Sequence, residues 1–192
     1  MMSQPQLRTP RLLLRRWLPS DREPFARLNA DPIVMEHFPD VLHREASDAF
    51  ADRIEAHFAE HGFGLWAIEV VDEADFIGFV GLSVPAFEAQ FMPAVEIGWR
   101  LAHACWNRGF GTEAALAAIA DGFERVGLPE IVSFTAPVNV RSIQVMERLG
   151  MTHNPADDFE HPRLPEGHRL RRHVLYRLSR TDWLEAQHRP RQ

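Results

Sequence analysis

Two glycines two residues apart, Gly109 and Gly111, lead directly into the alanine-rich stretch "TEAALAAIADGF". A loop that opens a helix presents backbone N–H groups without intrahelical partners, and the helix dipole adds positive potential at that end. Residues without a Cβ let an anion approach these groups closely. The loop therefore predicts an anion site, most plainly for a phosphate. The alternative interpretation is a simple turn between two elements.

Apolar alternation and short apolar runs predict the strands around this loop. The predicted strands are residues 11–17, 65–71, 76–84, 94–101, 130–138 and 171–183, the last of them running into a short tail. The second and third flank the acidic turn "DEAD", so we expect them to form an antiparallel hairpin.

Helices are predicted where apolar residues recur at three- and four-residue spacing and capping residues stand at the ends. We expect the first helix to be capped by Ser20 or Asp21 and to end near Asn29. The other predicted helices are residues 44–62, closed by Gly62; a helix from Thr112 with Leu116, Ile119, Phe123 and Val126 on its apolar face; and residues 140–150, between the cap Asn139 and Gly150. This order of elements predicts an α+β domain around one mixed, mostly antiparallel central sheet.

The composition narrows the class of protein. With 192 residues, 45% of them hydrophobic, the chain suits one well-packed domain and is short for two. The formal charge of −6, with both signs interspersed, argues against nucleic-acid binding, which needs a concentrated basic surface. Every basic residue other than histidine is arginine, which excludes Schiff-base chemistry on lysine and the lysine-bearing phosphate loop.

The cysteine and histidine residues and the N-terminal segment narrow the class of protein further. Cys105 is the only cysteine, so no disulfide forms within one chain. The apolar triplet Leu12–Leu14 between arginines is too short for a signal-peptide core or a membrane span. None of the ten histidines falls in a tight metal-ligand spacing. We expect a cytoplasmic protein with no metal and no membrane partner.

Two separated stretches, "VEIGWRLAHACWNRGFGTEA" and "NVRSIQVMERLGM", together resemble the GNAT superfamily of acetyl-CoA-dependent N-acetyltransferases. Within it, "LRTPRLLLRRW", "NADPIVMEHF" and "HVLYRLSRTDW" resemble the branch that includes the ribosomal-protein alanine N-acetyltransferases. The resemblance spans about the whole chain and implies a single N-acetyltransferase domain over residues 1–192. It also implies helices on both faces of the sheet and a V-shaped splay between the strand that ends at Leu101 and residues 130–138.

The resemblance implies that residues 95–123 and 139–151 hold acetyl-CoA. Backbone N–H groups from Asn107 to Thr112 would bind the pyrophosphate, and Trp106 stands where the family usually has Gln or Arg. Asn139 would bind the pantetheine arm, or it could be a helix cap without ligand contact. The implied cofactor-binding residues are Leu101, Trp106, Asn107, Arg108, Gly109, Phe110, Gly111, Thr112 and Asn139.

Acetyl transfer to an amine needs a neutral nucleophile, a stabilised carbonyl oxygen and, ideally, a proton for the departing thiolate. Glu96 is the carboxylate placed best to act as general base, beside the implied cleft; the alternative is a glutamate satisfied by neighbouring backbone or arginine. Many family members carry a tyrosine acid where this chain has Met146. We predict that Ser142 replaces it, unless Ser142 is only a serine on the helix surface.

The acceptor is expected to contact residues 17–66 and 153–173. His37, Phe38, His161 and His168 are candidates for its recognition, although solvated loop residues would look the same. Trp17 and Trp66 could pack against an acceptor, but core tryptophan is the simpler interpretation.

These expectations combine into one function. We predict transfer of an acetyl group from acetyl-CoA to a primary amine by direct attack in a ternary complex. The acceptor would be a protein N-terminus or a small amine, and a homodimer is compatible with the family. The alternative is a catalytically weak acyl-CoA-binding sensor.

Overall fold

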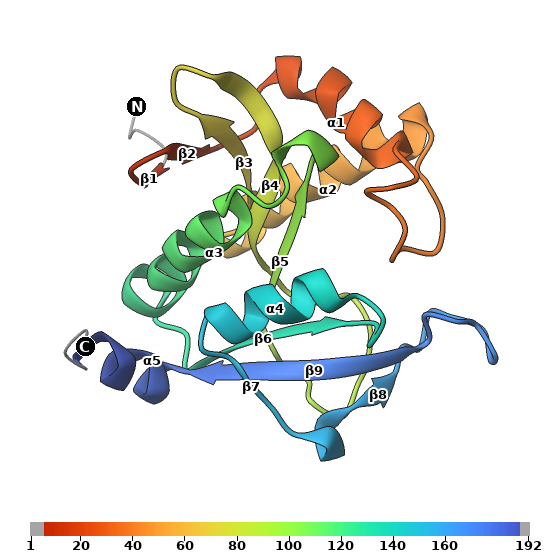
Figure 1. The fold of residues 1–192 in the computed structure, drawn as a ribbon, viewed down its shortest axis with the longest axis vertical. Helices are drawn as coiled ribbons and strands as arrows, with labels where there is room; N and C mark the ends of the chain where they lie inside the picture. Colours follow the sequence, from red (N-terminus) through yellow and green to blue (C-terminus); the bar gives the residue numbers. More distant parts are fainter. Residues whose placement is uncertain (1–5, 189–192) are drawn as a thin grey trace.

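A computed structural model describes residues 6–188 (Figure 1). Its strands are β1 (Leu7–Arg8), β2 (Leu12–Arg15), β3 (Leu65–Val70), β4 (Ala74–Ser83), β5 (Glu96–Leu101), β6 (Glu130–Thr135), β7 (Thr152–His153), β8 (Phe159–Glu160) and β9 (Arg172–Ser179). The α-helices are α1 (Arg22–Ala30), α2 (Arg44–His61), α3 (Phe110–Asp121), α4 (Val140–Arg148) and α5 (Arg180–His188). A π-helical turn, Gly122–Val126, extends α3.

The strands form one mixed sheet in the order β1-β2-β3-β4-β5-β6-β9-β7, with β8 paired to β9. Every neighbouring pair is antiparallel except β5 and β6, which are parallel. In Figure 1, α3 and α4 lie on the near face of the sheet, and α1 and α2 lie behind it. The α+β fold with a mixed, mostly antiparallel sheet and helices on both faces is therefore confirmed.

The sheet opens between its two central strands. β5 and β6 share a single register pair, Glu96 with Val132, whereas β5 pairs with β4 along the whole length of β5. In Figure 1, β5 rises away from β6 and β9, which run across the lower half of the molecule. The predicted splay is thus present, and it separates the strand edges where a ligand could enter.

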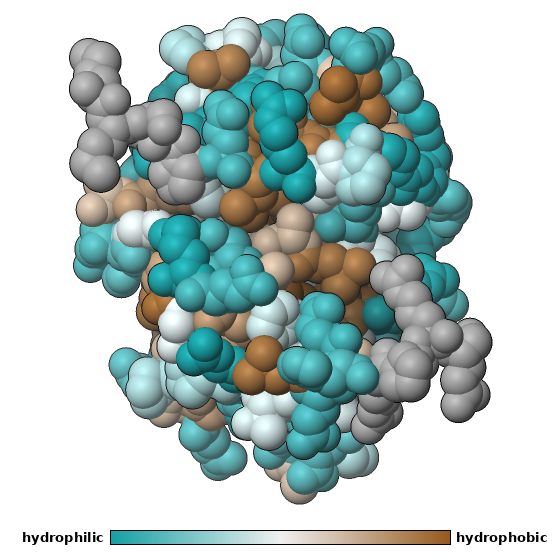
Figure 2. All heavy atoms as spheres, turned by 90° about the vertical axis from the view of Figure 1, so that its left-hand side faces the viewer, coloured by the Kyte–Doolittle hydropathy of each residue, from teal (hydrophilic) through white to brown (hydrophobic). Residues whose placement is uncertain are grey.

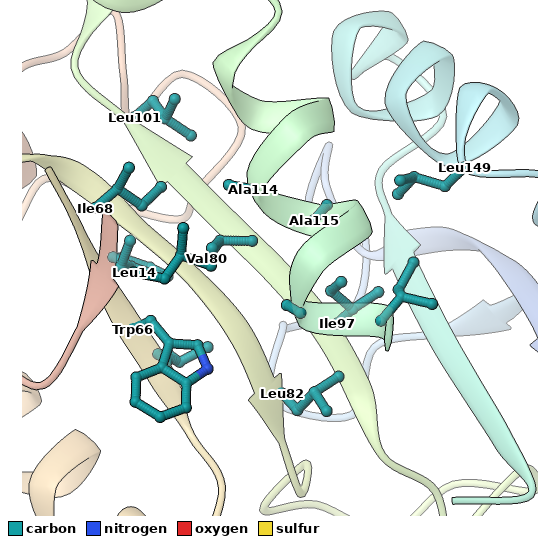
Figure 3. Close-up of a cluster of buried hydrophobic side chains, with 14 of the residues drawn as sticks. Leu14, Trp66, Ile68, Val80, Leu82, Ile97, Leu101, Ala114, Ala115 and Leu149 are labelled. Carbon is teal, nitrogen blue, oxygen red and sulfur yellow. The ribbon is translucent and has the colours of Figure 1, made fainter. Parts of the chain in front are cut away.

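The core covers both faces of the sheet, and the layer that positions the glycine loop lies between the sheet and α3. Figure 3 shows Ile97 and Leu101 of β5 beside Ala114 and Ala115 of α3, and all four are buried. Because alanine has a short side chain, α3 can approach the sheet closely and carry its N-terminus to the end of β5. This packing holds the glycine loop against the splay.

The apolar face predicted for this helix was partly wrong. Ile119 and Phe123 are buried as expected, but Leu116 is 46% exposed. Ala114, Ala115 and Ala118 take the buried face instead. A small residue next to the sheet permits closer packing than leucine does, so the helix is rotated relative to the predicted stripe.

Local capping explains the other differences. The predicted short tail after the last strand is the helix α5, since the Ser179 hydroxyl accepts a hydrogen bond from the backbone N–H of Asp182. Trp183 of α5 packs on Phe123, with ring centroids 5.2 Å apart. The expected cap Asp21 does not cap α1, because its carboxylate accepts from the backbone N–H of Leu18 and pairs with Arg15.

The other predicted helix-capping residues are confirmed. Asn139 caps α4, and Gly62 and Gly150 have positive φ after α2 and α4. The long polar stretch after α4 also contains β7 and β8, which the sequence did not reveal.

Hydrophilic side chains cover most of the face in Figure 2, with apolar residues showing between them near its middle. No helix in residues 6–188 is both long enough and apolar enough to cross a membrane.

Candidate functional site

A cavity of about 210 Å³ lies at the open end of the splay. The glycine loop, the end of β5, the first turns of α4 and the α1–α2 loop form its walls. The predicted cofactor and catalytic residues that line it are Leu101, Trp106, Asn107, Gly109, Phe110, Gly111, Thr112, Asn139 and Ser142. The structure therefore brings together side chains from two motifs that are about thirty residues apart in the chain.

The glycine loop presents free backbone donors to this cavity. None of the backbone N–H groups of residues 107–112 has a hydrogen-bond acceptor within the part of the chain that the structure describes. Gly109 has a φ of 79° and precedes the first turn of α3, a conformation that a residue with a Cβ rarely adopts. A row of unpaired N–H groups at a helix N-terminus is suited to a phosphate or pyrophosphate.

Arg11 of the β1–β2 hairpin holds the glycine loop in place. Its Nη1 donates to the carbonyl oxygen of Arg108 at 3.0 Å, and its Nε donates to the Glu113 carboxylate at 2.7 Å. The guanidinium also lies 4.6 Å from the ring centroid of Phe110. These contacts order the loop before any ligand binds, which lowers the entropic cost of binding.

Arg108 is placed differently from the other predicted cofactor residues. Its side chain forms two hydrogen bonds to Glu73, at 2.5 and 2.8 Å, and does not line the cavity. Only its backbone remains in the loop, so any contact with a phosphate would come from the N–H group.

Trp106 closes the loop against β5. Its indole Nε1 donates to the carbonyl oxygen of Leu101 at 2.8 Å, so that carbonyl already has a partner. The guanidinium of Arg141 lies 4.7 Å from the Trp106 ring centroid. Trp106 therefore links β5 to α4 across the mouth of the cavity.

Asn139 and Ser142 form a small network at the start of α4. The Asn139 side chain accepts from the backbone N–H of Ser142 and donates to the hydroxyls of Ser142 and Thr135, at 3.0 and 2.9 Å. Asn139 is thus both a helix cap and a wall residue. Because the Ser142 oxygen accepts from Asn139, its own proton is free to be donated into the cavity.

Glu96 lies at the point where β5 and β6 separate, and it does not line the cavity itself. Its carboxylate makes no hydrogen bond or ion pair with any other residue in the range 6–188. Loss of hydration raises the pKa of Glu96 to about 8, although its side chain keeps some contact with solvent. A carboxylate with this pKa can take up a proton near neutral pH.

Ser133 spans the splay next to Glu96. Its hydroxyl donates to the carbonyl oxygen of Ile97 at 3.0 Å, and the backbone N–H of Val132 donates to Val95 at 2.9 Å. Beyond this point the β5 edge has no strand partner, which is why the cavity can reach it.

Several wall residues were missed from the sequence. Three arginines line the cavity and no carboxylate does: Arg100, Arg141 and Arg148. Arg141 and Arg148 are seven residues apart on α4, a spacing that puts both on one helix face and could have indicated them. Ile33 and Val34 join the expected His37 and Phe38 in the α1–α2 loop.

The other acceptor candidates lie elsewhere. His161 packs in an aromatic cluster with Phe87 and Phe159, and burial lowers its pKa to about 4. His168 accepts from the backbone N–H of Leu170 and does not line the cavity. Trp66 is a core residue, and Trp17 packs on Phe25, as the simpler interpretation predicted.

The described residues contain no candidate metal centre. Residues 6–188 contain no group of three or more His, Cys, Asp or Glu side chains that could hold a metal ion. Cys105 is a free thiol at the edge of the cavity, and burial raises its pKa.

Comparison with known proteins identifies the family. The chain is 29% identical over 196 residues to the FsC-acetyl coenzyme A-N(2)-transacetylase of Aspergillus fumigatus, covering 96% of this chain and 80% of that protein. Its fold is similar to a GNAT-family acetyltransferase from Bacillus anthracis, with a TM-score of 0.75 and 23% identity over 92% and 99% of the two chains.

A spermidine N-acetyltransferase from Vibrio cholerae, solved with CoA and spermine, has a TM-score of 0.72 and 16% identity over 92% of this chain and 99% of its own. The model of the acetyltransferase (GNAT) domain matches residues 11–152, which include the glycine loop and α4. The chain therefore belongs to the GNAT acetyltransferase family, whose members use acetyl-CoA as co-substrate.

Proposed function

We propose that this enzyme transfers the acetyl group of acetyl-CoA directly to a primary amine in a ternary complex, with Glu96 as general base. The observation that carries the proposal is the pairing of an unsatisfied N–H row at residues 107–112 with an unpartnered carboxylate at the splay. The first is suited to the CoA pyrophosphate, and the second to an ammonium that must lose a proton.

The reaction assigns a separate task to each side of the splay. Glu96, directly or through a water molecule, takes a proton from the acceptor ammonium. The amine then attacks the thioester carbonyl, the C–N bond forms and the C–S bond breaks. The Ser142 hydroxyl, oriented by Asn139, would stabilise or protonate the departing thiolate. The pantetheine arm would lie between the end of β5 and α4.

The acceptor of the proposed reaction is a primary amine. A protein N-terminal amine, with an ordinary pKa of about 8, would share its proton evenly with Glu96. The named activity of the Vibrio protein, a spermidine N-acetyltransferase, extends the choice to small amines. We propose that residues 17–66 and 153–173 form the acceptor side, and that the ribosomal-protein branch is one candidate. A cytoplasmic location and a homodimer stay predictions.

The test is thiol release from acetyl-CoA with a panel of N-terminal peptides, amino acids and amines. Glu96→Gln should lower kcat about 10²- to 10³-fold with little change in the KM for acetyl-CoA, because it removes only the base. Gly111→Trp should raise the KM for acetyl-CoA strongly, since the tryptophan side chain would fill the space at the glycine loop that we assign to the pyrophosphate. In the wild type, kcat/KM should rise with pH up to about 8 as Glu96 loses its proton.

Two results would contradict the proposal. A Glu96→Gln enzyme with unchanged kcat would remove Glu96 from the chemistry. Tight CoA binding without thiol release for any amine would favour the acyl-CoA sensor. The complete burial of Met146, at the position of the family's tyrosine acid, is consistent with that second candidate.

A further inference from the structure

Arg100 is a buried cation without a counter-ion. The residue is 8% exposed and lines the wall of the cavity, and Nη1 donates to Oδ1 of Asn29. Nε is buried and has no hydrogen-bond partner, and no carboxylate in residues 6–188 forms an ion pair with the guanidinium. A buried charge left in this way costs free energy unless a ligand supplies its partner.

The surroundings hold this cation in place without neutralising it. The guanidinium carbon lies 4.0 Å from the ring centroid of Phe38 and 5.5 Å from that of Phe79. Asn29, its hydrogen-bond partner, donates in turn to the Ser47 hydroxyl at 2.8 Å, and both are fully buried. The side chain is therefore positioned by two helices and two rings, as a binding residue must be.

The neighbourhood favours an anion. His37, which also lines the cavity, has a buried Nδ1 without a partner, while its Nε2 lies 3.7 Å from the Glu36 carboxylate; no Asp or Glu lines the wall itself. Arg141 and Arg148 lie on the α4 side, next to the loop that we assign to the CoA phosphates. Arg100 extends instead from the opposite face of β5, toward α1 and α2.

Arg100 and Glu96 share that face of β5. They are four residues apart, so their Cα atoms are separated by about 13 Å along the strand. Gly98 lies between them and has no side chain to divide the face; its ideal Cβ position would be 3.9 Å from Oε1 of Glu96. One molecule lying along β5 could contact both charges.

We propose that Arg100 binds a carboxylate of the acceptor, at the opposite end of the molecule from the amine that Glu96 deprotonates. This inference rests on the proposed function and specifies its substrate class. The amine and carboxyl carbon of an α-amino acid are only about 2.5 Å apart, too close for both residues. The acceptor class is therefore an amino acid with a distal amine, or a short peptide with a free C-terminus.

The first experiment needs no variant. Wild-type kcat/KM is measured for 6-aminohexanoate, its uncharged amide, hexylamine and glycine, together with a tripeptide and its C-terminal amide. We expect each distal carboxylate to exceed its amide at least about 30-fold, as for a buried charge pair, and glycine to be poor. Equal rates for carboxylates and amides would overturn this inference while leaving the acetyltransferase intact. Absence of acetylation for every amine would instead overturn the proposed function.

Variants then locate the effect. In Arg100→Gln the preference for carboxylate over amide should fall to about twofold, because kcat/KM falls more for the carboxylates than for their amides. Arg100→Lys should retain part of the preference, because lysine keeps the positive charge but lacks the planar guanidinium that can donate two hydrogen bonds to one carboxylate. Arg27→Gln, at an exposed arginine of α1, is the matched control and should keep the full preference. A raised KM for acetyl-CoA with an unchanged carboxylate preference would assign Arg100 to the cofactor arm and overturn the inference.

Discussion

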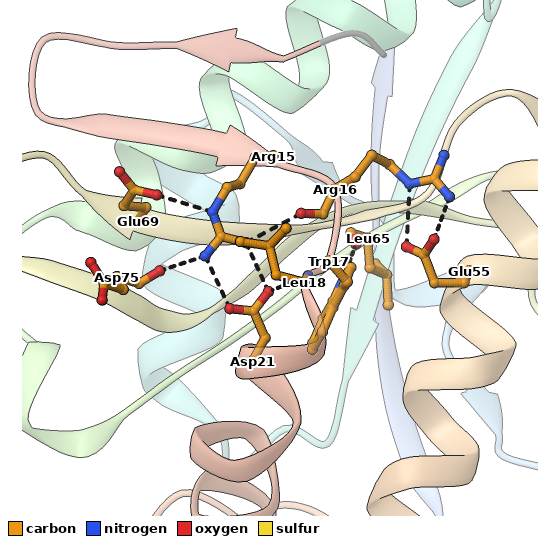
Figure 4. A network of polar contacts seen from close by, with 9 residues as sticks. All are labelled: Arg15, Arg16, Trp17, Leu18, Asp21, Glu55, Leu65, Glu69 and Asp75. Carbon is orange, nitrogen blue, oxygen red and sulfur yellow. Dashed lines mark hydrogen bonds and ion pairs between the residues drawn. The ribbon is translucent and has the colours of Figure 1, made fainter. Parts of the chain in front are cut away.

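Two buried arginines of the same sheet, Arg15 on β2 and Arg100 on β5, are almost equally enclosed, at 6% and 8% exposure. Figure 4 shows Arg15 surrounded by acceptors: two oxygens of Asp21 at 2.7 and 3.0 Å, Glu69 at 3.0 Å and the carbonyl of Asp75 at 2.7 Å. Arg100 has one amide oxygen and aromatic rings.

The pKa values show the same difference. Hydrogen bonding to Asp21 raises the pKa of Arg15, whereas burial lowers the pKa of Arg100 to about 9 and raises that of Glu96 to about 8. Arg100 is still a cation at neutral pH. The Arg15 network joins β2, β3 and the start of α1 with each of its charges paired, and the Glu96–Arg100 face keeps unpaired charges beside the splay. This contrast distinguishes a structural charge cluster from a binding surface.

The largest effect on stability is expected in the cluster of paired charges around Arg15. Arg15→Met leaves the buried Asp21 carboxylate without its cation, so the free energy of unfolding should fall by about 3–5 kcal/mol in urea titrations. Adding Asp21→Asn should restore part of the loss, since it removes the unpaired charge. A loss below about 1 kcal/mol for Arg15→Met would erase the contrast between the two arginines.

Whereas Arg15→Met should destabilise the protein, Glu96→Gln should stabilise it at high pH. The folded-state pKa of Glu96 lies above its unfolded value, so its contribution is fully present at low pH and is lost as pH rises through about 8. The glutamine variant should therefore match the wild type at pH 4, below the unfolded-state pKa, and exceed it by about 1–2 kcal/mol at pH 8.5. Thermal unfolding at both pH values tests this, and a variant that is less stable at pH 8.5 would show that the carboxylate has an unseen partner.

Arg100→Met should change the free energy of unfolding less than Arg15→Met or Glu96→Gln does. It removes the desolvated cation but also its contacts with Phe38, so the free energy of unfolding should stay within about 1 kcal/mol of the wild type. Urea unfolding beside Arg15→Met gives the direct comparison. A loss as large as that of Arg15→Met would mean that Arg100 is structural too.

An exposed arginine sets the baseline. Arg108 and Glu73 are 42% and 50% exposed, and solvent screens their ion pair. Arg108→Ala should shift the Tm by less than about 2 °C. A larger shift would show that its stacking on Phe110 stabilises the glycine loop.

The sequence by itself determined the elements whose signals are local. The Gly109–Gly111 loop before an alanine-rich helix, the Asn139 cap and the hairpin at "DEAD" depend on neighbouring residues, and all three are present as predicted. The family also followed from two motifs at their characteristic spacing. The α5 helix could have been predicted as well, because Ser179 and Asp182 form a local capping pair.

Only the tertiary structure decided which charges have partners. Arg15 and Arg100 look alike in the sequence, each beside apolar residues on a predicted strand. Asp21, Glu69 and Asp75 reach Arg15 from three separate segments, whereas Asn29 and Phe38 reach Arg100 from the α1–α2 region. Hydration and ion pairing depend on distances across the fold, and these are set by how the sheet and helices pack.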